Sequence, residues 1–204
     1  YVSCERVFNP KLEGRPVGVL SNNDGCVVAR SQEIKQLGVA MGAPAHQIEP
    51  HIRRKCTLLS SNYALYGDMS RRVTDVLSQH TPHVDVYSID ESFLSFEGFP
   101  TETLIERCQA MRYQVRRDTG IPVSVGLSTS KTLAKIANHR AKKEPGFDGV
   151  MMMEPGSDDT RAFLQQLPVT EIWGVAGRSA ARLRTLGIET AWQLREASPK
   201  HLRK

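Results

Sequence analysis

The sequence lacks the features that would place it in a membrane or outside the cell. No run of eighteen apolar residues occurs among its 204 residues, which excludes a membrane-spanning helix. Its four cysteines lie far apart without a CxxC pair, and its six histidines do not cluster. These absences argue against a disulfide scaffold or a zinc ribbon, and they favour a reducing cellular interior. Internal repeats and low-complexity tracts are absent as well.

What is present is the composition of an ordinary globular protein. Apolar residues make up 40% of the chain and charged residues 24%, and the length suits one or two domains with a real hydrophobic core. The sequence begins at Tyr1 rather than at a methionine, and it ends in a basic run at Lys204. We therefore expect it to be a piece of a longer protein, so missing targeting signals carry little weight.

The positive charge is concentrated at one end of the chain. Residues 1–160 contain 19 Lys and Arg against 19 Asp and Glu, whereas residues 161–204 contain 8 against 3. The net charge of +5 therefore lies entirely in the last 44 residues. A basic terminal segment is typical of a nucleic-acid contact, because binding to phosphates releases counterions. A solvated helical face has the same composition, and charge alone leaves both interpretations open.

Hydrophobic periodicity predicts an α+β domain followed by a small all-α domain. Strands are expected over residues 16–20, 26–29, 84–96, 123–127 and 149–153. Helices are expected over residues 31–37, 63–78, 103–117 and 130–137. Residues 50–56 resemble a loop, a bend is expected near Asp90–Glu91, and the chain from Asp158 onward is expected to be helical.

Asp90 and Glu91 are the first candidates for chemistry. Two adjacent carboxylates in a strand context, flanked by Ser88 and Ser92, are costly to desolvate unless a cation neutralises them. A divalent metal that prefers hard oxygen ligands, such as Mg²⁺, would do so. An exposed turn with two solvated acids explains the pair at least as well when it is taken alone.

Two further segments are candidate phosphate sites. Residues 126–131 (Gly-Leu-Ser-Thr-Ser-Lys) run from a strand through a small-residue loop into a helix with Lys131 in its first turn. Main-chain amides of such a loop attract phosphate and Lys131 adds charge, although the segment is not a Walker A motif. In residues 21–35, Arg30 and Lys35 are suited to hold a triphosphate. Arg30 would use its planar, fork-shaped guanidinium, and Lys35 the compact charge of its ammonium group. Plain connections with solvated basic residues are the structural alternatives.

The basic terminal segment contains a candidate DNA-binding turn. Residues 172–178 (Ile-Trp-Gly-Val-Ala-Gly-Arg) and the helical pattern after them resemble a helix-hairpin-helix. In that motif, the backbone amides around Gly174 and Gly177 would meet a DNA phosphate without reading bases. Arg178 and Arg182 lie alongside, which favours DNA binding over an ordinary helical hairpin.

In this order, the segments resemble the Y-family translesion DNA polymerases, specifically the UmuC branch, over essentially the whole chain. Residues 1–5 look like the end of the family's opening motif, and residues 20–30 look like its fingers signature. Residues 87–91 (Tyr-Ser-Ile-Asp-Glu) resemble its catalytic motif. Residues 60–70 are similar to the segment that returns to the palm, and residues 128–135 to the palm's phosphate-binding stretch.

The resemblance implies a fold of three parts. A palm of mixed sheet and packed helices would comprise residues 1–10 and 61–153, a small fingers insertion residues 11–60, and an all-α helix-hairpin-helix thumb residues 154–204. By this resemblance, we do not expect the family's little finger or its clamp-binding tail within these 204 residues. The enzyme implied is an error-prone, DNA-directed DNA polymerase of the bacterial cytoplasm, which copies damaged DNA in repair and SOS mutagenesis.

The resemblance also implies roles for individual residues. Asp90 and Glu91 would bind two Mg²⁺ ions for nucleotidyl transfer from a dNTP to a primer on template DNA. Lys35 and Lys131 would contact the triphosphate. Tyr1 would be the steric gate that stacks under the sugar and excludes a 2′-hydroxyl. The protein partners implied are a UmuD-type accessory subunit, a RecA filament and a sliding clamp.

Two departures from the family pattern bear on activity. The family's first metal-binding aspartate lies five residues before the position matched by Tyr1, where this sequence begins, so the chain as given is expected to be inactive or nearly so. Ala176 replaces the second glycine that is usual in the hairpin. Two rival functions stay open. One is a palm-fold nucleotidyl cyclase, which does not explain the basic hairpin, and the other is a non-catalytic DNA-binding remnant.

Overall fold

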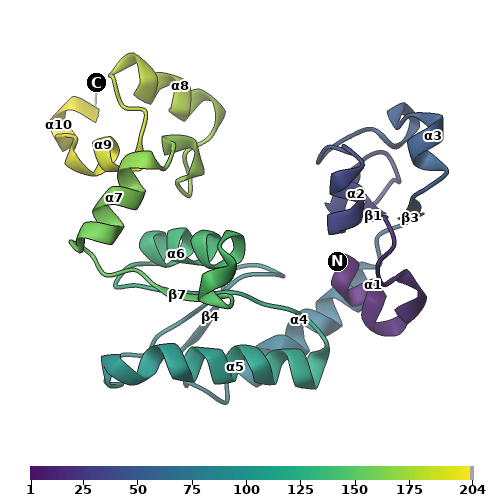
Figure 1. Cartoon of the computed structure of the whole chain (residues 1–204), viewed down its shortest axis with the longest axis horizontal. Coiled ribbons are helices and arrows are strands. Elements are labelled where there is room, and N and C mark those ends of the chain that lie inside the picture. The colour runs from purple at the N-terminus through teal and green to yellow at the C-terminus, as the bar shows by residue number, and fades with distance from the viewer. Residues whose placement is uncertain (203–204) are drawn as a thin grey trace. The chain divides into compact units, whose positions relative to one another are not determined.

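The chain forms two compact units in the computed structural model, which describes residues 1–202 (Figure 1). The first unit comprises Tyr1–Gly98 and Met111–Val123, and the second comprises Phe99–Ala110 and the chain from Ser124 onward. Helix α5 (Leu104–Thr119) contributes to both units. Arg203 and Lys204 are the last two residues of the basic terminal segment, and they lie outside the described residues.

The first unit is built from short strands and helices. Its helices are α1 (Val2–Phe8), α2 (Gln32–Gln36), α3 (Pro50–Arg53) and α4 (Tyr63–Leu77). Its strands are β1 (Val17–Leu20), β2 (Val27–Arg30), β3 (Thr57–Leu59), β4 (Val84–Val86) and β5 (Ser92–Leu94).

Strand β1 is the centre of a three-stranded sheet of order β2-β1-β3. It pairs antiparallel with β2 and parallel with β3, with Val17 opposite Thr57. The Ser31 hydroxyl accepts the N–H of Ile34, which caps α2, and also accepts the N–H of Val17 at 3.0 Å. One serine thus joins the start of α2 to the sheet. The strands and the helix predicted over residues 16–37 are confirmed.

The prediction of a loop over residues 50–56 holds for residues 54–56 but is wrong for residues 50–53, which form α3. Proline suits the first position of a helix, where the missing N–H would have no helical partner. Strand β3 follows α3 and was not predicted. Its parallel partner β1 is distant in sequence, so no local alternation marks the pairing.

Helix α4 and the hairpin after it agree with the sequence pattern. Asn62 caps α4, and its side-chain oxygen accepts the N–H of Leu65 at 3.1 Å. Strands β4 and β5 pair antiparallel, with Val84 opposite Leu94. The bend between them lies at residues 88–90, as expected.

The second unit begins with a small parallel sheet and the helix that covers it. Strand β6 (Val125–Leu127) pairs with β7 (Val150–Met152), and α6 (Lys131–Lys143) connects them. Gly126 of β6 permits an unusually close approach of α6. A Cβ at this position would collide with the carbonyl oxygen of Ala134 and the amide nitrogen of Asn138.

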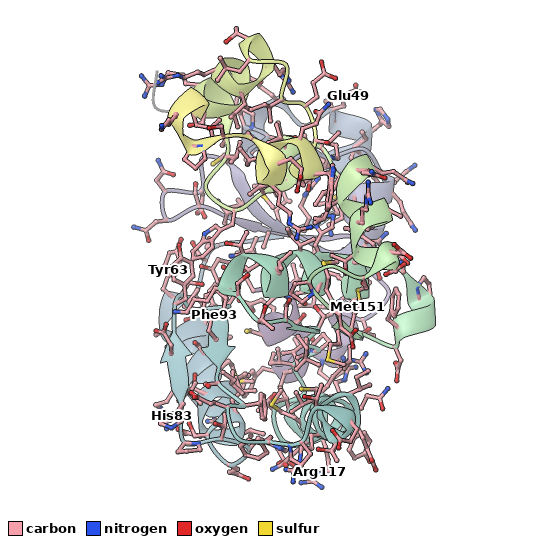
Figure 2. The ribbon with its side chains drawn as sticks, turned by 90° about the vertical axis from the view of Figure 1, so that its left-hand side faces the viewer. Glu49, Tyr63, His83, Phe93, Arg117 and Met151 are labelled. Atoms are coloured by element: carbon pink, nitrogen blue, oxygen red, sulfur yellow. The ribbon has the colours of Figure 1, made fainter. Side chains whose placement is uncertain are left out.

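Only helical elements follow β7 among the described residues, as the sequence predicted. They are α7 (Asp158–Gln166), α8 (Gly177–Thr185), α9 (Ala191–Glu196), α10 (Pro199–Leu202) and a 3-10 turn at Val169–Glu171. The core of this unit combines residues of α6, β7, α7 and α9, including Ile136, Met151 (labelled in Figure 2) and Leu164.

Arg140 links α6 to α7 within the second unit. Its guanidinium lies 5.1 Å from the ring centre of Phe147 and 4.8 Å from that of Phe163. The same group donates hydrogen bonds to the carboxylates of Glu144 and Asp159. These bonds hold the pKa of Asp159 below its ordinary value. The Arg140 side chain is only 13% exposed, and its positive charge is paired with the carboxylates of both Glu144 and Asp159.

Helix α5 confirms the helix predicted over residues 103–117. Cys108, Met111 and Val115 of this helix are buried, whereas Ile105 is 40% exposed. Within residues 1–202, no helix is both long enough and apolar enough to cross a membrane.

Candidate functional site

Asp90 and Glu91 lie at the tip of the β4–β5 hairpin, where the turn is held by its own hydrogen bonds. The Ser88 hydroxyl donates to Asp90 Oδ1 at 2.9 Å. The N–H groups of Tyr87 and Ser88 both donate to the carbonyl of Glu91, at 3.1 and 3.0 Å. The ring of Tyr87 also meets Phe93 of β5 edge-on, at 5.9 Å between centroids. The Asp90 carboxylate is therefore presented to solvent from a fixed turn.

Tyr1 belongs to a cluster of three tyrosines. Its ring stacks on Tyr66 of α4, with 4.3 Å between centroids and 12° between planes, and it meets Tyr63 edge-on at 6.0 Å. Tyr66 is buried, and its hydroxyl donates to Glu5 Oε1 at 2.7 Å. Tyr63, the first residue of α4 (Figure 2), is 45% exposed. The Tyr1 ring thus rests on a buried ring that is anchored at its far end.

The environment of Tyr1 affects the ionisation of its hydroxyl. Burial raises the pKa of the Tyr1 hydroxyl, and the charges of Tyr63 and Asp90 raise it further. Burial is the larger cause, and the negative charges add to it because they oppose ionisation of the hydroxyl. The residue expected under the sugar and one expected metal ligand both belong to the first unit.

The two adjacent carboxylates fit a magnesium ion that also binds substrate. Within residues 1–202, no three His, Cys, Asp or Glu side chains gather as a ready-made ligand set. Mg²⁺ is commonly held by one or two carboxylates together with waters and substrate phosphates, rather than by an all-protein cage. Asp90 and Glu91 supply hard oxygen donors of this kind at an accessible turn.

Arg30 and Lys35 differ in how they are held. Arg30 lies at the end of β2, where its Nη1 donates to the carbonyl of Val39 at 2.8 Å. Its Nε is buried and has no hydrogen-bond partner within the described residues. Lys35 of α2 is exposed. The structure therefore fixes Arg30 against the protein backbone and leaves the Lys35 side chain at the surface.

The turn that joins β1 to β2 is closed by side-chain hydrogen bonds. The Ser21 hydroxyl donates to Asn23 Oδ1 at 2.8 Å and accepts the N–H of Gly25 at 3.2 Å. Asp24 has a φ of +54°, a conformation that aspartate tolerates better than most residues. Its carboxylate accepts a hydrogen bond from the Ser60 hydroxyl at 3.0 Å. The fingers signature expected here thus forms a rigid polar turn.

Lys131 is exposed at the start of α6, in the second unit. The loop before it is fixed on both sides by serines. The Ser128 hydroxyl donates to the carbonyl of Met153 at 2.7 Å, and the Ser130 side chain caps α6 by accepting the N–H of Leu133. The expected strand–loop–helix arrangement is present.

The candidate DNA-binding turn connects the 3-10 turn at Val169–Glu171 to α8. Gly174 and Gly177 have φ values of +84° and +44°, which L residues rarely adopt. Ala176 has an ordinary extended conformation with a φ of −142°, so alanine fits this position without strain. The first helix of the expected hairpin is this short 3-10 turn. Arg178 and Arg182 of α8 are both exposed.

Two contacts connect this turn to α6. The Lys135 ammonium lies 4.9 Å from the ring centre of Trp173, and His139 Nε2 lies 3.8 Å from Glu171 Oε2. Desolvation and the nearby positive charge of Lys143 lower the pKa of His139. The lowered pKa disfavours the protonated imidazole, which is the form that would pair with the Glu171 carboxylate.

Comparison with known sequences identifies the family. The sequence model of the impB/mucB/samB family matches residues 1–139, and that of the IMS family HHH motif matches residues 157–188. The chain belongs to the impB/mucB/samB family. It is 46% identical to UmuC of Salmonella typhimurium over its whole length, and it spans 49% of that protein. The chain therefore covers about half the length of this curated relative, and the resemblance to the UmuC branch is confirmed.

Solved structures confirm the fold of this impB/mucB/samB family member. An insertion ternary complex of Dbh DNA polymerase matches with a TM-score of 0.83 and 28% identity, over 100% of this chain and 59% of that one. A Y-family DNA polymerase chimera matches with a TM-score of 0.79 and 28% identity, over 93% of this chain and 55% of the chimera. The expected Y-family polymerase fold, with a helix-hairpin-helix motif after the α+β part, is therefore present.

Several residues that support the candidate site were not predicted from the sequence. Tyr63 and Tyr66 are three positions apart at the start of a predicted helix, and this spacing places both rings on one face. That pattern is a usable signal for the cluster around Tyr1. The contact of Lys135 with Trp173 joins residues far apart in sequence, and no local pattern marks it.

Proposed function

We propose that this chain is the polymerase portion of a UmuC-like translesion DNA polymerase. The observation that carries the proposal is the match of the chain to the family along its length, and the fixed, exposed turn that holds Asp90 supports it. Such a site suits nucleotidyl transfer, in which the 3′-hydroxyl oxygen of a primer bonds to the α-phosphorus of a dNTP. The bond from that phosphorus to pyrophosphate breaks as the new bond forms.

Asp90 and Glu91 are the residues that would hold magnesium. When bound, two such ions stabilise the attacking and leaving oxygens and neutralise charge on the phosphates. The chain's contribution is to fix the carboxylates before substrate arrives. Ser88 sets the position of the Asp90 side chain, and the paired amides fix the Glu91 backbone. Fixed ligands reduce the reorganisation that accompanies substrate binding.

Tyr1 would select the sugar, and basic residues would bind the triphosphate. A ring that stacks on Tyr66 cannot retreat toward α4, so a 2′-hydroxyl above it would meet a fixed surface. We assign Lys35 and Lys131 to the triphosphate, since both are exposed lysines that act as compact charges. Arg30 belongs to the same assignment, with its Nη1 bond to Val39 orienting the guanidinium.

The helix-hairpin-helix would hold the DNA duplex. The backbone around Gly174 and Gly177 turns sharply, and the N–H groups at the start of α8 suit a phosphate. Arg178 and Arg182 add positive charge on the same helix. In the proposed domain scheme, residues 1–10 and 61–153 form the palm, 11–60 the fingers and 154–204 the thumb.

The cellular role follows from the family and forms part of the proposal. UmuC-like proteins suit error-prone copying of damaged DNA during the SOS response in the bacterial cytoplasm. A UmuD-type subunit, a RecA filament and a sliding clamp are the protein partners of this role. The similarity to UmuC supports them, at 46% identity over a chain that spans 49% of that protein.

The test is primer extension by a chimera in which residues 1–204 replace the matched segment of Salmonella typhimurium UmuC. Asp90→Asn should reduce nucleotide addition by at least about 10³-fold, because it removes a charged metal ligand. Glu97→Gln is the matched control, since Glu97 is an exposed carboxylate just beyond the same hairpin. Asp90→Asn with full extension activity would refute the assignment. DNA binding without any extension by the parent chimera would instead favour a non-catalytic remnant.

A further inference from the structure

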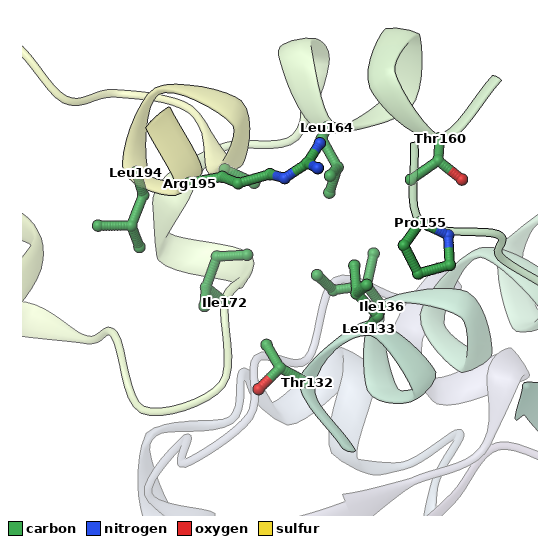
Figure 3. A pocket seen from close by; sticks show the side chains of 10 residues that line it. Thr132, Leu133, Ile136, Pro155, Thr160, Leu164, Ile172, Leu194 and Arg195 are labelled. Atoms are coloured by element: carbon green, nitrogen blue, oxygen red, sulfur yellow. The ribbon is translucent and has the colours of Figure 1, made fainter. Parts of the chain in front are cut away.

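A cavity within the second unit has a lining suited to an apolar ligand. It has a volume of about 260 Å³ and lies between α6, α7 and α9 (Figure 3). Aliphatic side chains from these helices and from the segments between them form most of its wall, namely Leu133, Ile136, Pro155, Leu164, Ile172 and Leu194. Ile136 and Leu164 are 5% and 3% exposed, so the cavity reaches the core of the unit.

One cation borders this cavity. Among the described residues that line it, Arg195 alone is charged, and its side chain extends from α9 across the upper side in Figure 3. The Arg195 guanidinium lies 4.7 Å from the ring centre of Trp192. Stacking uses the flat face of a guanidinium, whereas an anion is bound by its N–H edge. Arg195 is therefore able to stack on Trp192 and to bind an anion at the same time.

The size and the charge of the cavity together restrict what it accepts. A closed apolar cavity of about 150 Å³ accommodates benzene, so this half-open space of about 260 Å³ has room for two fused rings. A ligand with several charges would bury some of them against aliphatic walls without partners, which is strongly unfavourable. A neutral ligand would gain less from Arg195 than an anion, because it lacks the opposite charge. The favoured ligand is therefore aromatic, small and singly negative.

We propose that this cavity is a binding site for a small aromatic monocarboxylate. The rings lie against Leu133, Ile136 and Leu164, and the carboxylate accepts hydrogen bonds from Arg195. A ligand in this place contacts α6, α7 and α9 together. It therefore stabilises the packing of these helices in proportion to its occupancy. The site is formed by the second unit alone, and it does not rest on the proposed polymerase function.

The probes are 2-naphthoate and its neutral analogue 2-naphthamide, titrated into the 204-residue chain by isothermal calorimetry. We expect one saturable site for 2-naphthoate and about tenfold weaker binding of the amide, because only the carboxylate carries a negative charge to pair with the Arg195 guanidinium. Naphthoate should also raise the unfolding temperature. Equal binding of both compounds, or no saturable binding of naphthoate, would overturn the proposal.

Three variants locate the site. Arg195→Gln should weaken 2-naphthoate binding about tenfold and leave 2-naphthamide unchanged. Arg184→Gln changes an exposed arginine of α8 that does not line the cavity, and it should affect neither compound. Leu194→Trp should fill the space and abolish both, with folding checked by circular dichroism. Wild-type binding by Leu194→Trp would place the ligand elsewhere and refute the site. If that variant does not fold, the Arg195→Gln result decides.

Discussion

Replacing Gly126 with alanine puts a methyl group where α6 already lies against β6. The new Cβ would overlap the carbonyl oxygen of Ala134 and the amide nitrogen of Asn138, and it would lie 2.8 Å from the Asn138 Cα. All three atoms belong to the helix backbone, so no side-chain rotation relieves the overlap. The helix must move away from the strand instead.

The expected cost is the sum of two opposing effects. Overpacking of a close interface costs about 1–3 kcal/mol, and a clash with backbone atoms belongs at the upper end, about 3 kcal/mol. Alanine also lowers the conformational entropy of the unfolded chain relative to glycine, which raises the unfolding free energy by about 0.4–1 kcal/mol. The net loss of unfolding free energy for Gly126→Ala is therefore about 2 kcal/mol.

Gly146→Ala is the matched control in the same unit. Gly146 lies in the 3-10 turn Pro145–Phe147 and is exposed, and a Cβ added to it would have no other atom within 4 Å. Urea unfolding of both variants, followed by circular dichroism, gives the comparison. If the unfolding free energies of the two variants agree within about 0.5 kcal/mol, the reasoning is refuted. In that case α6 would move away from β6 without a measurable loss of stability.

Three further substitutions test other parts of the structure. Arg140→Gln should lower the unfolding free energy by about 2 kcal/mol in urea, because it removes charge-assisted bonds and two ring contacts, whereas exposed Lys142→Gln should change it little. Tyr1→Ala in the UmuC chimera should raise ribonucleotide incorporation, and unchanged sugar selection in extension assays would contradict the steric role. Replacing Arg178 and Arg182 with alanine should weaken primer–template binding equally for all sequences. In a salt titration, that variant should reduce the slope by about one per lost phosphate contact.

Local signals predicted most of the helices and strands. Serine caps at Ser31 and Ser130 mark the starts of α2 and α6, and both serines accept the expected backbone N–H. Strand β3 and helix α3 were not predicted, because a three-residue strand and a single helical turn carry too little periodicity. The pairing of β3 with β1 depends on residues distant in sequence.

The candidate site also has one part that the sequence predicts and another that it does not. The adjacent carboxylates and the basic hairpin are visible as short motifs, since their residues are neighbours in sequence. The stacking of Tyr1 on Tyr66, and the anchoring of Tyr66 by Glu5, depend on how α1 packs against α4. Such contacts arise from tertiary packing, and no motif of neighbouring residues encodes them.

Asp90 and Glu91 lie on the connection between β4 and β5, and Lys131 directly follows the loop between β6 and α6. Serine hydroxyls give these connections, and the turn after β1, their shape. Ser88 binds the Asp90 carboxylate, Ser21 closes the turn after β1, and Ser128 ties the loop before α6 to Met153. A hydroxyl both donates and accepts, so one short side chain satisfies polar groups that a loop would otherwise leave without partners. Loops fixed in this way lose little entropy when a ligand binds. Two of these three contacts join residues that are close in sequence. Short sequence motifs therefore predict the segments that carry the proposed chemistry better than they predict the rest of the fold.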